Sequence, residues 1–219
     1  MNARCFATLA SIVVAGLPAA LGAQDPRLQE RLDARTRSAV QQVVDSAATT
    51  RLPTEPLIDK ALEGASKGAD NARIMAAVRA LARRLGESRL ALGTSANEAE
   101  LVAGAGALSQ GIAPATLSRL RTLRPGERLT LPLVVLTDLI ARGVPPSTAS
   151  SVIVSLAGTV SGSEAFAALR RDVQQDIVAG ADPAAAVSLR ARALLAALPP
   201  PPGKVVTTTD MENTSARPE

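Results

Sequence analysis

Four short stretches of this chain repeat one design: Lys67-Gly68-Ala69-Asp70-Asn71, Gln110-Gly111-Ile112-Ala113-Pro114, Arg142-Gly143-Val144-Pro145-Pro146 and Ala179-Gly180-Ala181-Asp182-Pro183. In each, a glycine closes a stretch of helical periodicity, and a proline, or an asparagine in the first, stands three places later. Glycine accepts the left-handed backbone at a helix C-terminus, and proline fits the first helical position because its missing N–H would have no partner there. We therefore predict helix ends at Gly68, Gly111, Gly143 and Gly180, and helix starts at Pro114, Pro146 and Pro183.

A helix end followed within a few residues by a helix start produces two antiparallel helices. The chain therefore predicts an all-α fold of tandem antiparallel helix hairpins, either an α-solenoid-like array or an irregular helical bundle. We expect about nine helices after the first 23 residues. The hairpin domain spans 51–198, and a single amphipathic helix over 24–50 precedes it. This helix is expected either to cap the open end of the array or to swing free and hold a partner.

The two ends of the chain have a different composition from the middle. Residues 1–23 carry one early positive charge, Arg4, then an apolar run and small residues before Gln24, which is the layout of a cleavable secretory signal peptide. Pro18 interrupts the run and leaves it short of the ~20 apolar residues of a spanning helix. At the other end, 199–219 begin with four prolines and continue as a polar stretch, which predicts a disordered tail. We expect a periplasmic or secreted protein that is not transmembrane after cleavage.

Charged residues on the first hairpin follow separate faces. Glu55, Asp59 and Glu63 form an acidic stripe on the first helix, and arginines are spaced along the outer side of the second: Arg73, Arg79, Arg83, Arg84 and Arg89. This pattern predicts ion pairs across the hairpin, each worth ~0 to 1 kcal/mol when exposed. Thr54 is expected to cap the first helix.

Two stretches match the capping box, in which a serine and a glutamate satisfy each other's backbone donors at a helix start. They are Ser95-Ala96-Asn97-Glu98 and Ser161-Gly162-Ser163-Glu164. They predict where the second and fourth hairpins begin.

Four arginines gather around the Pro125-Gly126 turn that ends the second hairpin: Arg119, Arg121, Arg124 and Arg128. Such a corner suits a phosphate or a carboxylate of a partner, because the guanidinium fork binds these groups bidentately. A set of solvated surface arginines is the alternative.

Asp138, inside the most apolar hairpin, likewise has two interpretations: a functional acid, or a carboxylate on the solvent face.

The composition excludes most catalytic chemistry. The 219 residues contain no histidine, tyrosine or tryptophan, and the one cysteine lies in the predicted signal peptide. Acid–base and nucleophilic roles would fall to Ser, Thr, Asp, Glu or the few lysines. No ligand set for a metal or phosphate loop for a cofactor is visible in the sequence, and we predict neither. A carboxylate pair for a glycosidase remains an alternative, drawn from Glu55, Asp59, Glu98, Glu100 and Asp138.

The stretch from Leu52 to Gly68, together with the recurring Gly-Val-Pro-Pro type of turn, resembles a group of uncharacterised exported bacterial proteins built of short helices. The resemblance covers about residues 52–198. The resemblance implies the helical fold and implies no particular activity.

These observations favour a non-enzymatic exported scaffold or interaction protein of the bacterial envelope. Without residues 1–23 the chain keeps 23 cations and 20 acids, a net charge of +3. Export and the scarcity of aromatic side chains for base stacking argue against a nucleic-acid partner. An envelope protein, a lipid headgroup or a wall polymer remains as the expected partner. The alternative function is a carboxylate-dependent hydrolase acting on cell-wall glycan.

Overall fold

The computed structural model describes residues 25–160 and 162–197, and within these it contains ten helices and no strand. The helices are α1 (Pro26–Arg31), α2 (Ala34–Thr49), α3 (Glu55–Ser66), α4 (Asn71–Leu92), α5 (Glu98–Ser109), α6 (Pro114–Leu123), α7 (Thr130–Ala141), α8 (Pro146–Thr159), α9 (Glu164–Val178) and α10 (Pro183–Ala196). The all-α prediction is confirmed. The expected signal peptide and C-terminal tail lie outside the described residues.

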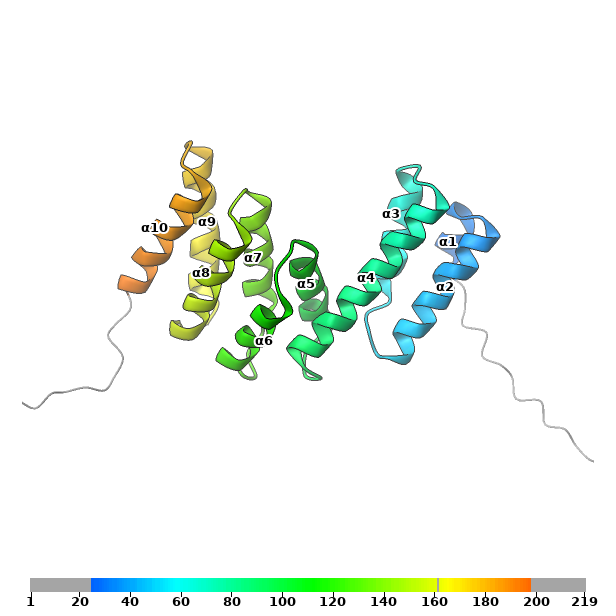
Figure 1. Cartoon of the computed structure of the whole chain (residues 1–219), viewed down its shortest axis with the longest axis horizontal. Coiled ribbons are helices and arrows are strands. Elements are labelled where there is room, and N and C mark those ends of the chain that lie inside the picture. The colour runs from blue at the N-terminus through cyan, green and yellow to red at the C-terminus, as the bar shows by residue number, and fades with distance from the viewer. Residues whose placement is uncertain (1–24, 161, 198–219) are drawn as a thin grey trace, which may run out of the picture.

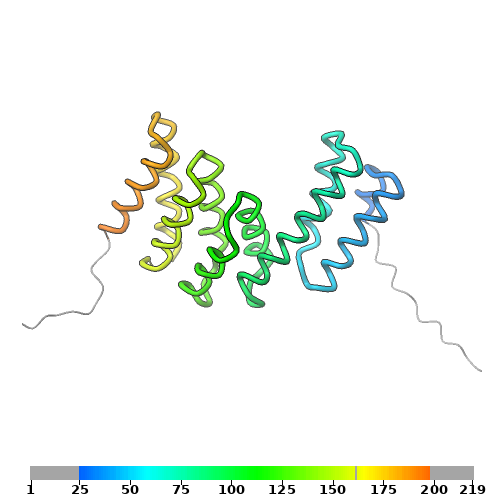
Figure 2. The backbone as a smooth tube through the Cα atoms, viewed as in Figure 1, coloured from blue at the N-terminus to red at the C-terminus, as the bar shows by residue number. Residues whose placement is uncertain are grey.

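The helices stand side by side in two rows, which run from α1 at one end to α10 at the other (Figure 1). The even-numbered helices form one continuous row, in which α2, α4, α6, α8 and α10 each pack on the next. In the odd-numbered row α1 packs on α3, and α5 packs on α7, which packs on α9. The long helix α4 joins the two parts of this row, because it packs along both α3 and α5 (Figure 2).

The four predicted turns share one hydrogen-bond pattern. The glycine N–H donates to the carbonyl three residues back, and the next N–H donates to the carbonyl five residues back, as in Gly143 to Ile140 and Val144 to Leu139. This is the Schellman ending of a helix. All four glycines have positive φ, between 67° and 95°. Pro114, Pro146 and Pro183 are the first residues of α6, α8 and α10, as predicted.

A fifth turn of the same kind has an arginine where the others have glycine. Arg51, after α2, has a φ of 56°, and it is the one residue other than glycine with positive φ in the described ranges. Its N–H donates to the carbonyl of Ala48, and the N–H of Leu52 donates to the carbonyl of Ala47. No glycine marks this turn in the sequence, and the turn was therefore not predicted.

The single helix expected over 24–50 is two helices, which brings the number to ten. Leu32 is extended, and the side chain of Asp33 accepts hydrogen bonds from the N–H groups of Arg35 and Thr36 at the start of α2. An aspartate that caps a helix in this way competes with helix continuation through it. The amphipathic pattern continues across the break because Leu28 and Leu32 are both buried. Helix α1 packs on α3, so this segment is docked.

Two local predictions were wrong, and a third rests on a residue outside the described ranges. Thr54 makes no side-chain capping bond because it is already in the helical region of backbone conformation. The capping box of α5 is formed by Asn97 and Glu100, two residues beyond the predicted pair. At α9, Ser163 makes no side-chain capping bond, and Ser161 lies outside the described residues.

The acidic stripe of α3 does not pair with α4. Arg27 of α1 donates to Glu55 at 2.7 Å and lies 3.7 Å from Asp59. Glu63 pairs with Lys60 of the same helix and with Lys67, the residue that follows α3. The stripe therefore faces the N-terminal helix rather than its hairpin mate. This leaves the arginines of α4 available for other contacts.

Leu, Val, Ile and Ala make up nearly all of the described core, with Phe166 as its one aromatic side chain. None of the described helices is both long and apolar enough to cross a bilayer.

Candidate functional site

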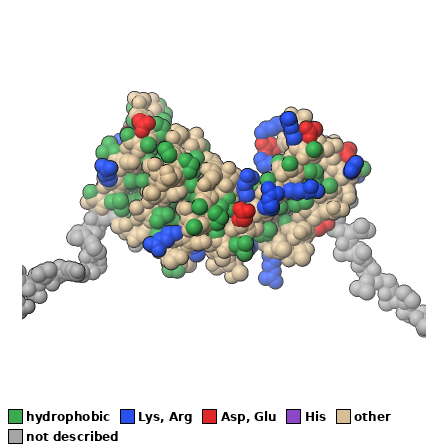
Figure 3. Space-filling view, in the orientation of Figure 1, with side chains coloured by type: hydrophobic (Ala, Val, Ile, Leu, Met, Phe, Trp, Pro, Cys, Tyr) green, Lys and Arg blue, Asp and Glu red, His purple; other side chains and the backbone are tan. Residues whose placement is uncertain are grey.

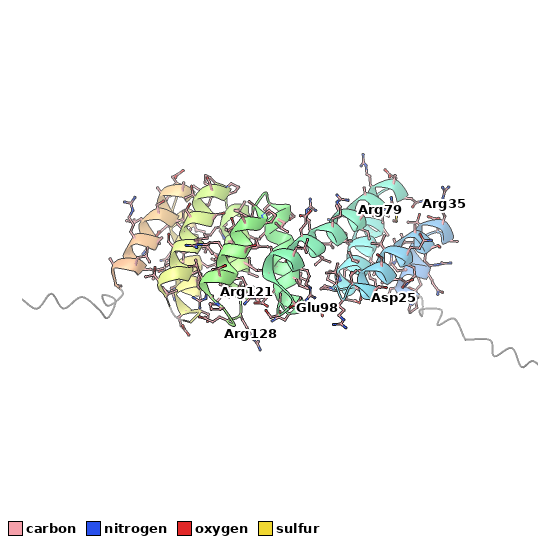
Figure 4. All side chains as sticks on the ribbon, turned by 60° about the horizontal axis from the view of Figure 1, so that its bottom comes forward. Asp25, Arg35, Arg79, Glu98, Arg121 and Arg128 are labelled. Atoms are coloured by element: carbon pink, nitrogen blue, oxygen red, sulfur yellow. The ribbon has the colours of Figure 1, made fainter. Side chains whose placement is uncertain are left out.

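The four arginines of the predicted corner have separate environments. Arg119 and Arg128 are exposed, Arg121 is half-buried, and Arg124 is buried with 3% of its surface exposed. Figure 4 shows Arg121 and Arg128 near one another at the lower side of the molecule. The corner therefore offers two arginines to a partner, and internal contacts occupy the other two.

Arg124 is bonded to backbone oxygens far along the chain. Its Nη1 donates to the carbonyl of Val160 at 2.8 Å, and its Nη2 donates to the carbonyl of Gly162 at 2.7 Å. Nη2 also pairs with the carboxylate of Glu127, and the guanidinium carbon lies 5.4 Å from the ring centre of Phe166. These contacts fasten the turn after α6 to the link between α8 and α9.

Arg121 is paired with Glu100, whose carboxylate is only 3% exposed. Glu100 accepts hydrogen bonds from Arg121 at 2.8 Å, from the N–H of Leu129 at 2.7 Å and from the N–H of Asn97 at 3.0 Å. Three donors from separate segments thus hold one buried carboxylate, which ties α5, α6 and the start of α7 together. From the sequence, Glu100 was only one of several candidate acids.

Asp138 also has two arginine partners. Arg142, the residue just after α7, donates to it at 2.9 Å and Arg170 of α9 donates at 3.1 Å, and the carboxylate is about one-fifth exposed. It is therefore a bridge between two helices of the odd-numbered row. Neither of the two interpretations offered above had included this ion pair.

The pKa values of Glu100 and Asp138 are shifted in the same direction. Burial raises the pKa of Glu100, but the N–H groups of Leu129 and Asn97 and the guanidinium of Arg121 together lower it below its usual value. Burial likewise raises the pKa of Asp138, and Arg142 and Arg170 lower it by more. A general acid needs a raised pKa. These two carboxylates therefore give no support to the glycan hydrolase alternative.

Metal ligands are also sparse in the described part of the chain. Residues 25–160 and 162–197 contain no group of three or more acidic or other metal-binding side chains close enough to hold an ion.

A basic groove lies between α2 and α4. Arg79 and Arg83 stand one helical turn apart on α4, both exposed, and no hydrogen bond or ion pair holds their guanidinium groups among the described residues. The groove has a volume of about 350 Å³ and contains no carboxylate in its lining; α2 contributes the polar side chains of Gln42 and Ser46. Figure 3 shows that basic side chains gather mainly over the half of the molecule that holds α1–α4.

The sequence had placed Arg79 and Arg83 on the outside of α4 but had assigned them to ion pairs with α3. That prediction was wrong, because the acidic side chains of α3 pair with Arg27, Lys60 and Lys67. The groove itself was not predictable from local pattern, since it forms where two helices of the same row meet.

Comparisons of the chain with models of protein families, with curated proteins and with solved structures gave no match.

Proposed function

We propose that this protein is a non-enzymatic interaction protein of the bacterial envelope that holds an anionic partner in the groove between α2 and α4. The observation that carries the proposal is the pair Arg79 and Arg83, which are exposed and have no ion-pair or hydrogen-bond partner among the described residues, in a groove whose described lining contains no carboxylate. Arginine binds phosphate and carboxylate oxygens through its planar fork. The absence of histidine and the lowered pKa values of Glu100 and Asp138 support a binding role over a catalytic one.

Phosphate is the chemistry that lipid headgroups share with an anionic wall polymer, and both are expected partners in the envelope. The location in the envelope rests on the signal-peptide pattern of residues 1–23. A partner bound through two arginines at an exposed groove should bind less tightly as the salt concentration rises.

A vesicle sedimentation experiment tests the proposal. The chain is mixed with vesicles of phosphatidylcholine alone and with vesicles that also contain phosphatidylglycerol, in low and in physiological salt. We expect binding to the anionic vesicles only. The double variant Arg79→Gln/Arg83→Gln should bind about 30-fold more weakly, since each basic residue at an anionic surface contributes about 1 kcal/mol.

Arg119→Gln/Arg128→Gln is the matched control, because it removes the same charge from the exposed part of the arginine corner. It should bind like the unchanged chain. Equal losses in both double variants would show a general charge effect and contradict the groove. A soluble polyphosphate that competes for the groove while neither vesicle binds would identify a polymer rather than a membrane as the source of phosphate.

A further inference from the structure

A second hollow opens on the other row of helices, where the odd-numbered row is interrupted between α3 and α5. It has a volume of about 460 Å³, within the range of small-molecule sites. One wall is the turn and loop before α3, which includes Arg51 and Pro53; the other wall is the start of α5, with Glu98 and Leu101. Arg89 of α4 also lines it. We refer to this hollow as the α3–α5 cleft.

Arg51 and Glu98 carry opposite charges on the two walls, yet they do not pair. Within the part of the chain that the structure describes, no ion pair or hydrogen bond holds the side chain of either residue, and both residues are exposed. Glu98 lies at the junction between α4 and α5 (Figure 4). The other two charged residues of the lining are already engaged: Glu55 binds Arg27, and Arg89 donates to the carbonyls of Arg51 and Thr94.

The conformation of Arg51 gives an independent reason to look for a ligand. Five turns of this chain have the same hydrogen bonds, and four of them place glycine at the left-handed position. The chain itself thus shows which residue the turn prefers. A side chain at that position strains the backbone, and strain of this kind concentrates at functional sites. No hydrogen bond or ion pair of the Arg51 side chain within the described residues compensates for this strain, and a contact with a molecule outside the chain would give arginine a physical reason here.

We infer that the α3–α5 cleft binds a small zwitterion, an amino acid or short peptide with free ends, whose carboxylate lies against Arg51 and whose ammonium group lies against Glu98. The guanidinium suits a carboxylate because it can donate two parallel hydrogen bonds. Pro53 and Leu101 supply apolar surface for the body of the ligand. The inference goes beyond the proposed function, since it concerns another ligand, another row of helices and residues other than Arg79 and Arg83.

Three related dipeptides test the charge requirement separately for each end. They are alanyl-alanine, its N-acetyl form, which lacks the ammonium group, and its C-terminal amide, which lacks the carboxylate. Each is titrated into the isotope-labelled chain while the backbone amide signals of Leu52, Glu98 and Leu101 are followed by NMR. We expect saturable shifts with alanyl-alanine and at least tenfold weaker binding of each blocked form.

Two variants remove the matching charges on the protein. Arg51→Gln should weaken alanyl-alanine binding about tenfold and should no longer distinguish it from the amide. Glu98→Gln should do the same for the N-acetyl form. The controls Arg119→Gln and Glu87→Gln, at exposed positions outside the cleft, should leave binding unchanged, as should Arg79→Gln/Arg83→Gln.

Arg51→Gly provides a readout that does not depend on the choice of ligand. It should raise the midpoint of thermal unfolding by about 2 °C, because the turn then has its preferred residue, and it should remove the shifts caused by alanyl-alanine. A lower midpoint would show that the Arg51 side chain serves the fold and would overturn the inference. Absence of saturable shifts in the unchanged chain, or equal binding of all three dipeptides, would overturn it as well.

Discussion

At the scale of single residues, Arg124 makes contacts of several kinds. It joins two backbone carbonyls, one carboxylate and one aromatic ring, and it is almost fully buried. The segments it connects lie 36 and 38 residues apart along the chain. Such contacts require a planar group with several diverging donors, which only arginine has.

Arg124→Lys should therefore lower the free energy of unfolding by about 2 kcal/mol, even though the charge is kept. A lysine ammonium cannot reproduce both carbonyl bonds, and a buried carbonyl without a donor costs about 1–3 kcal/mol. Urea unfolding followed by circular dichroism measures the change. The control is Arg119→Lys, an exposed position, which should stay within about 0.5 kcal/mol. Equal stability of the two variants would contradict the structural role of Arg124.

At the scale of elements, α4 and α5 approach closely at Gly104. A Cβ atom built on Gly104 would lie 2.2 Å from Oγ of Ser88 and 3.1 Å from Cδ2 of Leu117. On the same helix, a Cβ atom on Gly106 would meet only Thr137, at 3.9 Å, which is an ordinary contact. Two glycines that lie two residues apart on α5 thus have different physical roles.

Gly104→Ala should destabilise the protein, whereas Gly106→Ala should stabilise it. Alanine is better than glycine inside a helix by roughly 1 kcal/mol, and Gly106→Ala should realise most of that gain. At Gly104 the overlap of the new methyl group with Ser88 and Leu117 opposes this gain in stability, because overpacking a core costs typically 1–3 kcal/mol. We expect the two variants to differ by about 2 kcal/mol in thermal or urea unfolding. Higher stability of both variants would mean that α4 and α5 can move apart at little cost in free energy.

The two helices of the second predicted hairpin pack mainly on other helices. Its two helices form where expected, but α5 packs on α4 and α7, and α6 packs on α4 and α8. The tight turn at Gly111 therefore directs its helices into different rows, and packing between neighbouring units holds them there.

At the scale of the whole molecule, many carboxylates have pKa values below their usual range. Burial raises and donors lower the pKa of Glu100 and Asp138, with a net decrease, and two lysines lower the pKa of Glu63 to about 2. Arginine contacts lower the pKa of Asp25 and Asp176. These groups bind protons more weakly in the folded chain than in the unfolded one.

The protein should consequently lose stability in acid. The stabilisation from these carboxylates is complete above the unfolded pKa values near 4 to 4.5 and is lost as the pH falls through the lower folded values. Urea unfolding at pH 7, 5, 4 and 3 should show little change down to pH 5 and a steep decline below it. Glu100→Gln should be less stable at pH 7 and should show a shallower decline, and an unchanged slope would contradict the role of that carboxylate.

The candidate sites were only partly visible in the sequence. The exposed arginines of α4 and the acid Glu98 could be named from their helical positions, but which charged residues pair with one another could not. Arg121 and Glu100 lie 21 residues apart, and Arg124 and Val160 lie 36 apart. Whether such groups are free or engaged depends on which helices become neighbours, and no local pattern specifies that.

What the sequence determined by itself is the set of helices and most of their ends, because glycine and proline preferences act within a few residues through backbone sterics and hydrogen bonds. The tertiary structure alone decided which charges pair and where the rows leave a cleft. These features arise from contacts between segments far apart in the chain. Their free energies depend on burial and distance, and the folded arrangement supplies both.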